Sequence, residues 1–457
     1  MAEIVKRSKA LSVNPLKVSQ PVGASLAFLG VHRAIPMMHG SQGCTAFGKV
    51  FFVRHFREPI PLQTTAMDQG ATVMGADDSV IQGLATIAEK SRPAMIGVPT
   101  TGLSETQGAD IRRLVKVFRE QHPEFASIAV VPVVTPDYVG CLESGFALAV
   151  KAMIEYVVPA DTSRVGKRKK QVNVLAGSML TPGDLEHIKD LIELFGLRPV
   201  LLPDLSDSLD GHLTDMEFSP LTVGGTPVAE IATLGEAAAT LVIGRSLDAA
   251  ADLLKERTAV PDFRFDNLMG LEAMDAFIAA LAEISGQPVP EKIERQRDQL
   301  QDAMVDTHFM LGFARIAIAA DPDLLYSLSA LVAGMGCEVT AAVASSKSPL
   351  LNEVPTAEVK LGDLEDLELA IKERGADLIV CNSHAAGTAQ RLHLPLVRAG
   401  FPQYDLIGGY QRLWVGYRGT RQTLFDLANT LLAHGHHEMP AYRSIYAHAS
   451  PETHPLH

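Results

Sequence analysis

Two segments of this sequence, roughly 140 residues apart, repeat one pattern, and the repeat restricts the fold more than any other feature. Each segment has a short apolar run, a helix start with proline and aspartate, a glycine and a second apolar run. The first copy covers 172–202 and contains Thr181-Pro-Gly-Asp-Leu185, and the second covers 315–343 and contains Asp321-Pro-Asp-Leu324. Proline in the first helical turn and glycine after the last turn are typical helix boundaries. The pattern therefore predicts two copies of one strand–helix–strand unit.

The rest of the chain contains further elements of the same kind. Helices are expected at 111–121, at 142–157 and, as a long interdomain helix, at 291–311. Apolar runs that fit buried parallel strands lie at 94–98, 127–134, 241–244, 378–381 and 394–397. We therefore predict an α/β fold of three Rossmann-like domains with parallel sheets. The expected domains are 1–165, with an extended arm over 1–26, then 166–300 after a charged boundary at 160–171, and 301–457, with a C-terminal helix and a His-rich tail.

Net charge, cysteine content and hydropathy exclude several classes of protein. The formal net charge of −13 argues against a duplex nucleic-acid binder, because phosphate contacts require a basic face. The four cysteines, at 44, 141, 337 and 381, are too few and too scattered for a disulfide framework, which indicates a reducing compartment. The N-terminus lacks the apolar core of a signal peptide, and no apolar run is long enough to span a membrane. We expect a cytoplasmic protein.

The first candidate site is the cysteine of His39-Gly-Ser-Gln-Gly-Cys44. Two glycines allow a tight turn before it, and four basic residues follow between Lys49 and Arg57. A thiolate on an exposed turn, close to cations and free amides, is suited to binding a metal or acting as a nucleophile. One cysteine cannot complete an iron–sulfur site, which normally takes four ligands. Cys44 is therefore either a structural residue or has co-ligands elsewhere.

Two other motifs have a more ordinary explanation. The stretch from Gly43 to Lys49 has the spacing of a phosphate-binding loop, but Val50 stands where a magnesium-binding Ser or Thr belongs. Residues 100–110 follow a strand and open a helix, with Ser104 as the expected cap and Gln107 three residues later. Bare amides at such a helix start could hold an anion or a cluster sulfide. For residues 100–110 we favour an ordinary capped helix without a ligand.

The remaining histidines and cysteines form no complete catalytic set. His384 follows a strand and either presents its imidazole to a ligand or, more simply, makes a structural hydrogen bond. Cys141, Cys337 and Cys381 are best explained as small packing residues. Six of the fifteen histidines lie near the C-terminus, which indicates either weak metal affinity or a solvated tail, and we favour the tail: His434, His436, His437, His448, His454 and His457. No Gly-x-Ser-x-Gly nucleophile motif occurs, and we assign no catalytic residue.

Three long strings give the chain a resemblance to a known family. They are His39 to Cys44 with Phe51-Phe-x-Arg-His-Phe-Arg-Glu-Pro59, Asp306-Thr-His-Phe-Met310 with Asp321-Pro-Asp323, and Arg398-Ala-Gly-Phe-Pro-Gln-Tyr-Asp405 with Gly416-Tyr-Arg-Gly419. On these strings the chain resembles the β-type subunits of the nitrogenase component 1 family, collinearly over nearly its whole length. The resemblance implies the fold of that family.

Departures from the catalytic β-subunit of that family are informative. That subunit has cysteines at the positions of Leu62 and Leu103, where they help to hold the P-cluster, and a leucine offers no lone pair to iron. With Cys44 alone retained, the chain is not expected to build a P-cluster. Leu62-Gln-Thr-Thr-Ala-Met-Asp68 and Gly102-Leu-Ser-Glu-Thr-Gln-Gly108 instead resemble the members of the family that assemble the iron-molybdenum cofactor.

That resemblance implies a scaffold rather than an enzyme, although it leaves a weak reductase activity of the assembled complex open. The implied partner is NifE, in a heterotetramer with two copies of each subunit. This complex receives an iron–sulfur precursor from NifB and matures it with molybdenum and homocitrate, in transient contact with the nitrogenase iron protein and cofactor carrier proteins. A 4Fe-4S cluster shared with NifE takes one ligand from this chain, and the match implies Cys44. The precursor is held mainly by the partner, so no residue here is assigned to it.

Three alternatives remain. The first is a β-type subunit of a related nitrogenase-like reductase. The second is a nucleotide-dependent enzyme that uses residues 43–50. The third is a structural protein without metal, in which Cys44 is a buried packing thiol.

Overall fold

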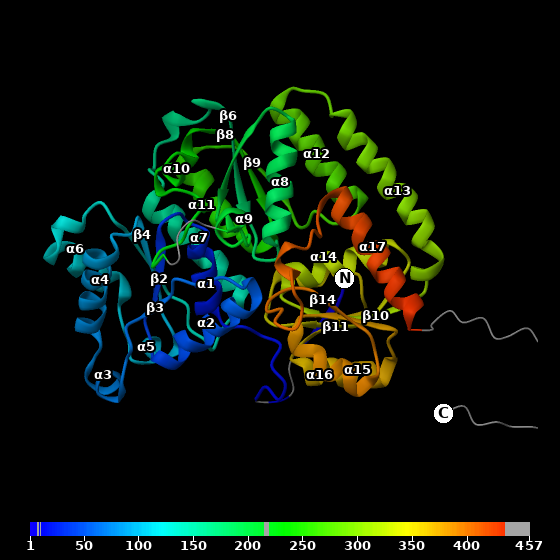
Figure 1. Ribbon diagram of the computed structural model, residues 1–457, viewed down its shortest axis with the longest axis horizontal. Coiled ribbons are helices and arrows are strands. Elements are labelled where there is room, and N and C mark those ends of the chain that lie inside the picture. The colour runs from blue at the N-terminus through cyan, green and yellow to red at the C-terminus, as the bar shows by residue number, and fades with distance from the viewer. Residues whose placement is uncertain (7–8, 10, 214–218, 435–457) are drawn as a thin grey trace, which may run out of the picture.

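The computed structural model describes residues 1–6, 9, 11–213 and 219–434, which form three β-sheets with helices around them (Figure 1). Neighbouring strands in all three sheets run parallel. Parallel strands need crossover connections, and helices supply them here. The predicted α/β fold with three parallel sheets is confirmed.

The first sheet has the strand order β3-β2-β4-β5 and contains the predicted strands near 94–98 and 127–134. Its strands are β2 (Ala34–Met38), β3 (Gln63–Thr64), β4 (Met95–Pro99) and β5 (Ala129–Val133). The helices of this part of the chain are α1 (Gln20–Leu29), α2 (Gln42–Phe56), α3 (Gln69–Met74), α4 (Asp77–Ser91), α5 (Gly102–Thr106), α6 (Ile111–Gln121) and α7 (Leu142–Val157). The helices predicted at 111–121 and 142–157 are confirmed.

The second sheet has the order β7-β6-β8-β9. Its strands are β6 (Arg168–Ala176), β7 (Arg198–Leu202), β8 (Ala237–Ile243) and β9 (Asp262–Phe265). Its helices are α8 (Pro182–Leu194), α9 (Leu205–Ser208), α10 (Val228–Ile231), α11 (Asp248–Thr258) and α12 (Leu271–Ser285). The predicted long helix is α13 (Glu291–Leu311), which lies beside α17 (Gly416–Ala433) (Figure 1).

The third sheet has six strands in the order β1-β12-β11-β10-β13-β14. Its strands are β1 (Glu3–Val5), β10 (Arg315–Ala320), β11 (Glu338–Ala344), β12 (Glu358–Leu361), β13 (Leu378–Cys381) and β14 (Leu396–Arg398). Besides α17, its helices are α14 (Pro322–Gly334), α15 (Leu364–Arg374) and α16 (Ala386–Leu392).

Both copies of the repeat fold as predicted. The first is β6–α8–β7 and the second is β10–α14–β11. Pro182 and Pro322 stand in the first turns of their helices, where a missing N–H costs no hydrogen bond. Gly196 and Gly336 follow the helices with φ of 70° and 80°, a conformation that favours glycine.

The prediction of an extended arm over 1–26 is wrong in its second half and incomplete in its first. Residues 20–29 form α1, with Pro21 in its first turn, and the helix is buried along its whole length because small or apolar residues follow. At the chain start, β1 pairs with β12 at the edge of the third sheet, with Glu3 opposite Glu358. The N-terminal residues therefore connect the first helix to the last sheet.

The charged boundary predicted at 160–171 is also partly wrong, because β6 begins at Arg168. Glu236 forms ion pairs with Arg164 and with Arg168, where Nε lies 2.6 Å from Oε2. Because these ion pairs neutralise the basic side chains, β6 can begin at Arg168, earlier than the apolar residues of the strand indicate.

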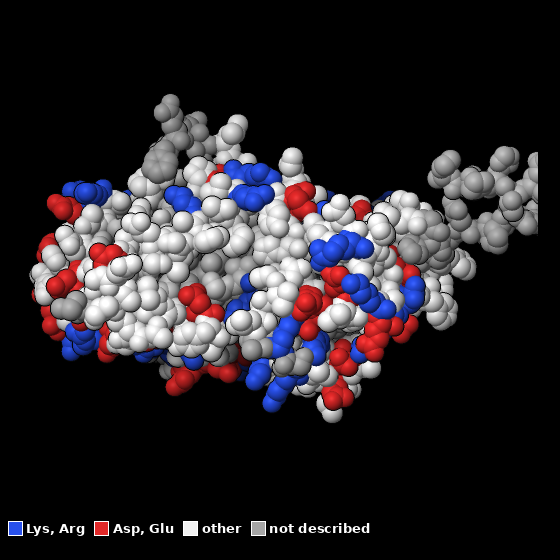
Figure 2. Space-filling view, turned by 90° about the horizontal axis from the view of Figure 1, so that it is seen from below, with Lys and Arg blue, Asp and Glu red and all other residues white. Residues whose placement is uncertain are grey.

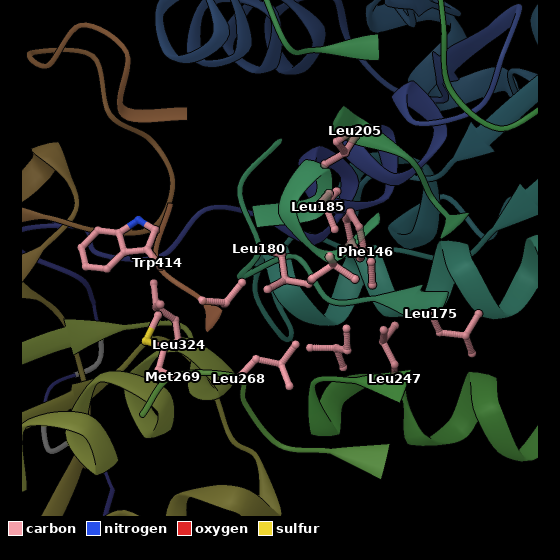
Figure 3. Packing of buried hydrophobic residues seen from close by; sticks show 14 of the residues in the cluster. Phe146, Leu175, Leu180, Leu185, Leu205, Leu247, Leu268, Met269, Leu324 and Trp414 are labelled. Carbon is pink, nitrogen blue, oxygen red and sulfur yellow. The ribbon is translucent and has the colours of Figure 1, made fainter. Parts of the chain in front are cut away.

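A continuous apolar core joins the three sheets (Figure 3). Phe146 of α7, Leu185 of α8 and Leu324 of α14 belong to it, and so does Trp414, which precedes α17. Each of these side chains is 5% exposed or less. Full burial of such a side chain contributes roughly 1.5–3 kcal/mol. The three sheets therefore share one core instead of standing as separate bodies.

Candidate functional site

Cys44 is the third residue of α2, at the carboxyl edge of the first sheet. Ser41 is the N-cap and makes no side-chain cap hydrogen bond, which leaves the first amides of the helix available to an external acceptor. The Ser41 hydroxyl lies 3.5 Å from the Cys44 sulfur. The thiol is partly exposed. The positive end of the α2 dipole lies at this helix start.

The loop before Cys44 is held from two sides. The His39 carbonyl accepts hydrogen bonds from Thr101 Oγ1 at 3.0 Å and from Ser104 Oγ at 2.9 Å, and His39 Nδ1 lies 3.0 Å from Thr65 Oγ1. A Cβ on Gly40 would lie 2.5 Å from Thr101 Oγ1, so this position requires glycine. Burial lowers the pKa of His39 to about 4. The neutral ring and its bonds position the backbone that leads to Cys44.

The buried face of α2 packs against a segment of the third sheet's chain, far away in sequence. His55 Nδ1 accepts a hydrogen bond of 2.9 Å from the Gln403 amide, and burial lowers the pKa of His55 to about 3, which keeps the ring an acceptor. The Phe401 ring lies 4.8 Å from His55, 5.6 Å from Phe52 and 6.3 Å from Phe56. Two of the strings that carry the family resemblance therefore form one aromatic cluster, which holds α2 in place.

The outer face of α2 presents apolar side chains to solvent. Phe47 is 72% exposed and Val50 is 51% exposed, and Cys44 lies one helical turn from Phe47. The loop between β5 and α7 adds Val134 and Tyr138 at the same sheet edge, both exposed. Figure 2 shows a wide area without charged side chains over this first part of the molecule. Exposed apolar patches of this kind mark interaction surfaces.

Within the described residues, Cys44 has no co-ligand for a cluster. No group of three or more His, Cys, Asp or Glu side chains there is placed to hold a metal ion. The positions of Leu62 and Leu103 offer only hydrocarbon, and Leu62 is 5% exposed. The residues present thus fit a cluster that takes one thiolate from this chain, together with free helix amides. They do not fit a cluster held by this chain alone.

The other three cysteines are buried. Burial raises the pKa of all three thiols, to about 12 for Cys337 and Cys381. A thiolate is the form that binds iron, and burial disfavours it at these places. Their environments match small packing residues.

Neither of the two ambiguous motifs forms a ligand loop. Residues 43–50 form turns of α2 instead of a loop that precedes the helix, so the spacing does not build a phosphate-binding loop. Ser104 is not the cap of α5 as predicted, because Thr101 is the N-cap and its amide donates to Ser104 Oγ at 3.0 Å. The helix start at 100–110 is nevertheless capped, as favoured from the sequence.

His384 extends the aromatic cluster under α2. Its ring lies 5.8 Å from Phe51 and 5.8 Å from Tyr404, and burial lowers its pKa. Of the six histidines near the C-terminus, His434 is exposed at the end of α17, and the other five lie outside the described residues.

A group of acids that we did not predict, with Glu143 and Asp323 buried and Asp321 half-buried, lies where the three sheets meet. Glu143 Oε2 accepts a hydrogen bond of 2.8 Å from the Asp323 amide, and Asp321 accepts from Ser345. Burial raises the pKa of Glu143, Asp321 and Asp323. In the sequence, Asp321 and Asp323 mark a helix start and belong to a family string, and neither pattern carries a sign of their long-range neighbours.

Comparisons with known proteins agree with this fold. No helix among the residues described here is both long and apolar enough to cross a membrane. The sequence profile of the nitrogenase component 1 type oxidoreductases matches residues 19–432. The nitrogenase iron-molybdenum cofactor biosynthesis protein NifN of Klebsiella pneumoniae is 46% identical over 444 residues, covering 97% of this chain and 96% of the relative. NifN of a Nostoc species is 47% identical over 432 residues, covering 94% and 96%.

Solved structures show the same fold. A chain of the nitrogenase Cp1 structure at pH 6.5 superposes with a TM-score of 0.88 at 32% identity, covering 95% of this chain and 96% of the other. A chain of the Cp1 structure at pH 5, 14% identical, superposes with a TM-score of 0.71 and shares the fold.

Proposed function

This chain belongs to the nitrogenase component 1 type oxidoreductases, and on that premise we propose that it is a scaffold subunit for biosynthesis of the iron-molybdenum cofactor. Relatives that match it over nearly their whole length are NifN proteins of that biosynthesis. In this proposal Cys44 is its single ligand to a 4Fe-4S cluster shared with a partner subunit.

The observation that carries the proposal is the incomplete site at Cys44. The thiol is partly exposed at a helix start, and exposed apolar side chains lie beside it. Within the described residues, no second ligand completes a metal site there. A site of this kind becomes whole when another chain brings thiolates and covers the apolar face. The cluster supplies one-electron transfer when bound, while this chain contributes one sulfur and helix amides.

The partner in this proposal is NifE, with two copies of each chain in the complex. The complex takes up an iron–sulfur precursor from NifB, held mainly by NifE, and matures it with molybdenum and homocitrate. The nitrogenase iron protein and cofactor carrier proteins bind transiently. The exposed apolar side chains of Phe47 and Val50 on α2 support a permanent partner at the Cys44 face.

A β-type subunit of a related reductase is the second candidate. Its support is the fold, which is that of a nitrogenase component 1 chain. Against a catalytic nitrogenase subunit stand Leu62 and Leu103, which cannot bind iron.

The test is anaerobic co-purification with NifE, followed by iron counting and EPR of the reduced complex. We expect Cys44→Ala to lose or alter the 4Fe-4S signal while the complex still forms. Cys337→Ala makes the same chemical change at a buried thiol and should leave iron and signal as in the wild type. Unchanged iron and an unchanged signal in Cys44→Ala would refute the shared-ligand assignment.

A further inference from the structure

Ser41 stands at the N-cap of α2 but does not cap the helix with its side chain. Its backbone has the extended conformation typical of a cap, with φ of −73° and ψ of 158°, yet the hydroxyl accepts no hydrogen bond from the first turn. A serine or threonine at this position normally accepts from a backbone amide two or three residues later, as Thr181 does from the Asp184 amide in α8. Among the described residues, the one hydrogen-bond partner of the Ser41 hydroxyl is the Cys44 sulfur, 3.5 Å away. The hydroxyl is therefore available to the sulfur instead of the helix.

The direction of this hydrogen bond is determined when Cys44 binds iron. A cysteine binds a metal as the thiolate, whose sulfur carries no proton and can only accept. A serine hydroxyl has one O–H donor. In the iron-bound form, Ser41 therefore donates to Cys44.

The backbone on both sides of Ser41 is held in place. The Gly40 amide donates to Thr65 Oγ1 at 3.2 Å, and the Gly40 carbonyl accepts from the Met67 amide at 2.9 Å. On the other side, Cys44 belongs to the first turn of α2, and the next residue, Thr45, is buried. The hydroxyl and the sulfur thus lie side by side in the chain as it stands, so the hydrogen bond requires no rearrangement of the loop.

We propose that Ser41 is a positioning residue that raises the reduction potential of the iron–sulfur cluster through the Cys44 sulfur. This inference rests on the proposed function, in which Cys44 is a cluster ligand. One-electron reduction adds negative charge to the cluster and its thiolates, so a hydrogen bond to a ligand sulfur stabilises the reduced form more than the oxidised form. Hydrogen bonds to the sulfurs are among the features that set the potentials of such clusters. Removing the hydroxyl should therefore lower the potential without removing a ligand.

The experiment is an anaerobic redox titration, followed by EPR, of the complex with NifE for the wild type, Ser41→Ala and Ser41→Thr. We expect Ser41→Ala to keep its iron and to lower the equilibrium constant for reduction about three- to ten-fold. At about 59 mV per ten-fold change for one electron, the potential then drops by about 30–60 mV. Ser41→Thr keeps a hydroxyl and should stay within about two-fold of the wild-type equilibrium constant. Because Ser41 makes no cap hydrogen bond, thermal unfolding of Ser41→Ala should match that of the wild type.

The matched control is Ser163→Ala, which removes an exposed serine hydroxyl that bonds to Asp161 and should leave the potential unchanged. An unchanged potential in Ser41→Ala, an equal drop in Ser163→Ala, or a drop that Ser41→Thr shares would overturn the proposal. Loss of iron in Ser41→Ala would also overturn it, because the residue would then be needed to retain the cluster. Failure of the proposed function looks different: iron and signal would not depend on Cys44, and both proposals would fall together.

Discussion

The two copies of the repeated unit each place an aspartate in the first turn of the helix and use it differently. Asp184 is the third residue of α8 and Asp323 is the second of α14, each in the first turn after the proline. Both are buried, and burial raises the pKa of each to about 6. Each also bonds to a distant part of the chain: Asp184 accepts from the amides of Trp414 and Val415, and Asp323 accepts from the amide of Ser246.

The number of hydrogen-bond donors separates the two sites. Asp184 accepts three backbone N–H bonds, at 2.6 Å from Trp414, 3.0 Å from Val415 and 3.0 Å from Thr181. Asp323 accepts through Oδ2 from the Ser246 amide at 3.1 Å, while its Oδ1 is buried and has no hydrogen-bond partner among the described residues. Donors offset the cost of burying a carboxylate in the first copy and do so poorly in the second. The same local pattern thus gives one buried carboxylate with three hydrogen-bond donors and another with few.

The largest expected effect on stability comes from truncating Asp184, the aspartate with three hydrogen-bond donors. Asp184→Ala leaves three backbone amides without their acceptor, and we expect a loss of about 3 kcal/mol or more in the free energy of unfolding. Asp323→Ala leaves only the Ser246 amide without its acceptor and should lower the free energy of unfolding by about 1 kcal/mol. Urea unfolding at pH 7 measures both values. Equal losses would show that the donor count does not distinguish the copies.

The pH dependence of stability gives a medium effect. Because the pKa of Asp323 rises from 3.8 to about 6 on folding, the native state keeps a proton that the unfolded chain loses between about pH 4 and 6. The free energy of unfolding therefore falls as pH rises through that window. Asp323→Asn removes this component, on the order of 1–3 kcal/mol, and places an amide where Oδ1 has no partner.

Urea unfolding at several pH values between 4 and 8 tests this expectation. The slope should flatten in Asp323→Asn without vanishing, because Asp184 contributes with the same sign. A slope as steep as in the wild type would mean that Asp323 ionises as readily when folded as when unfolded.

The smallest effect concerns the ends of the two helices. α8 ends at Leu194, whereas α14 ends at Gly334, where an added Cβ would meet no atom within 4 Å. Gly334→Ala should raise the free energy of unfolding by about 0.5–1 kcal/mol, because glycine loses more backbone entropy on folding. Gly336→Ala is the control: at φ of 80° alanine is strained, and stability should drop by about 1–2 kcal/mol. Thermal unfolding compares them, and a loss in both would indicate contacts at Gly334 that the structure lacks.

Several features could be predicted from the sequence because their causes lie within one or two turns of the chain. The bounds of α6 and α7 follow from apolar spacing, and the start of α8 follows from Thr181 and Pro182. The cap of α5 was misplaced at Ser104, because a cap and its partner three residues later exchange bonds and either can look like the first residue.

In the candidate site, too, the residue types could be predicted from the sequence and the long-range contacts could not. Cys44, and the leucines at 62 and 103, are visible in the sequence as residue types. The contact between His55 and Gln403 joins residues 348 positions apart, and no local sequence pattern predicts it. The sequence also placed basic residues near Cys44 without showing that its closest exposed neighbours on α2 are apolar.

The sequence by itself determined where α6, α7 and α13 begin and end, which strand–helix–strand units repeat, and that one cysteine has no cysteine neighbours at the positions of Leu62 and Leu103. Tertiary structure alone decided that β1 joins the third sheet, that Asp323 is buried beside Glu143, and that Phe401 packs against α2. Helix signals act over a few residues, whereas burial, charge and hydrogen-bond satisfaction depend on groups that the fold brings together from hundreds of residues away.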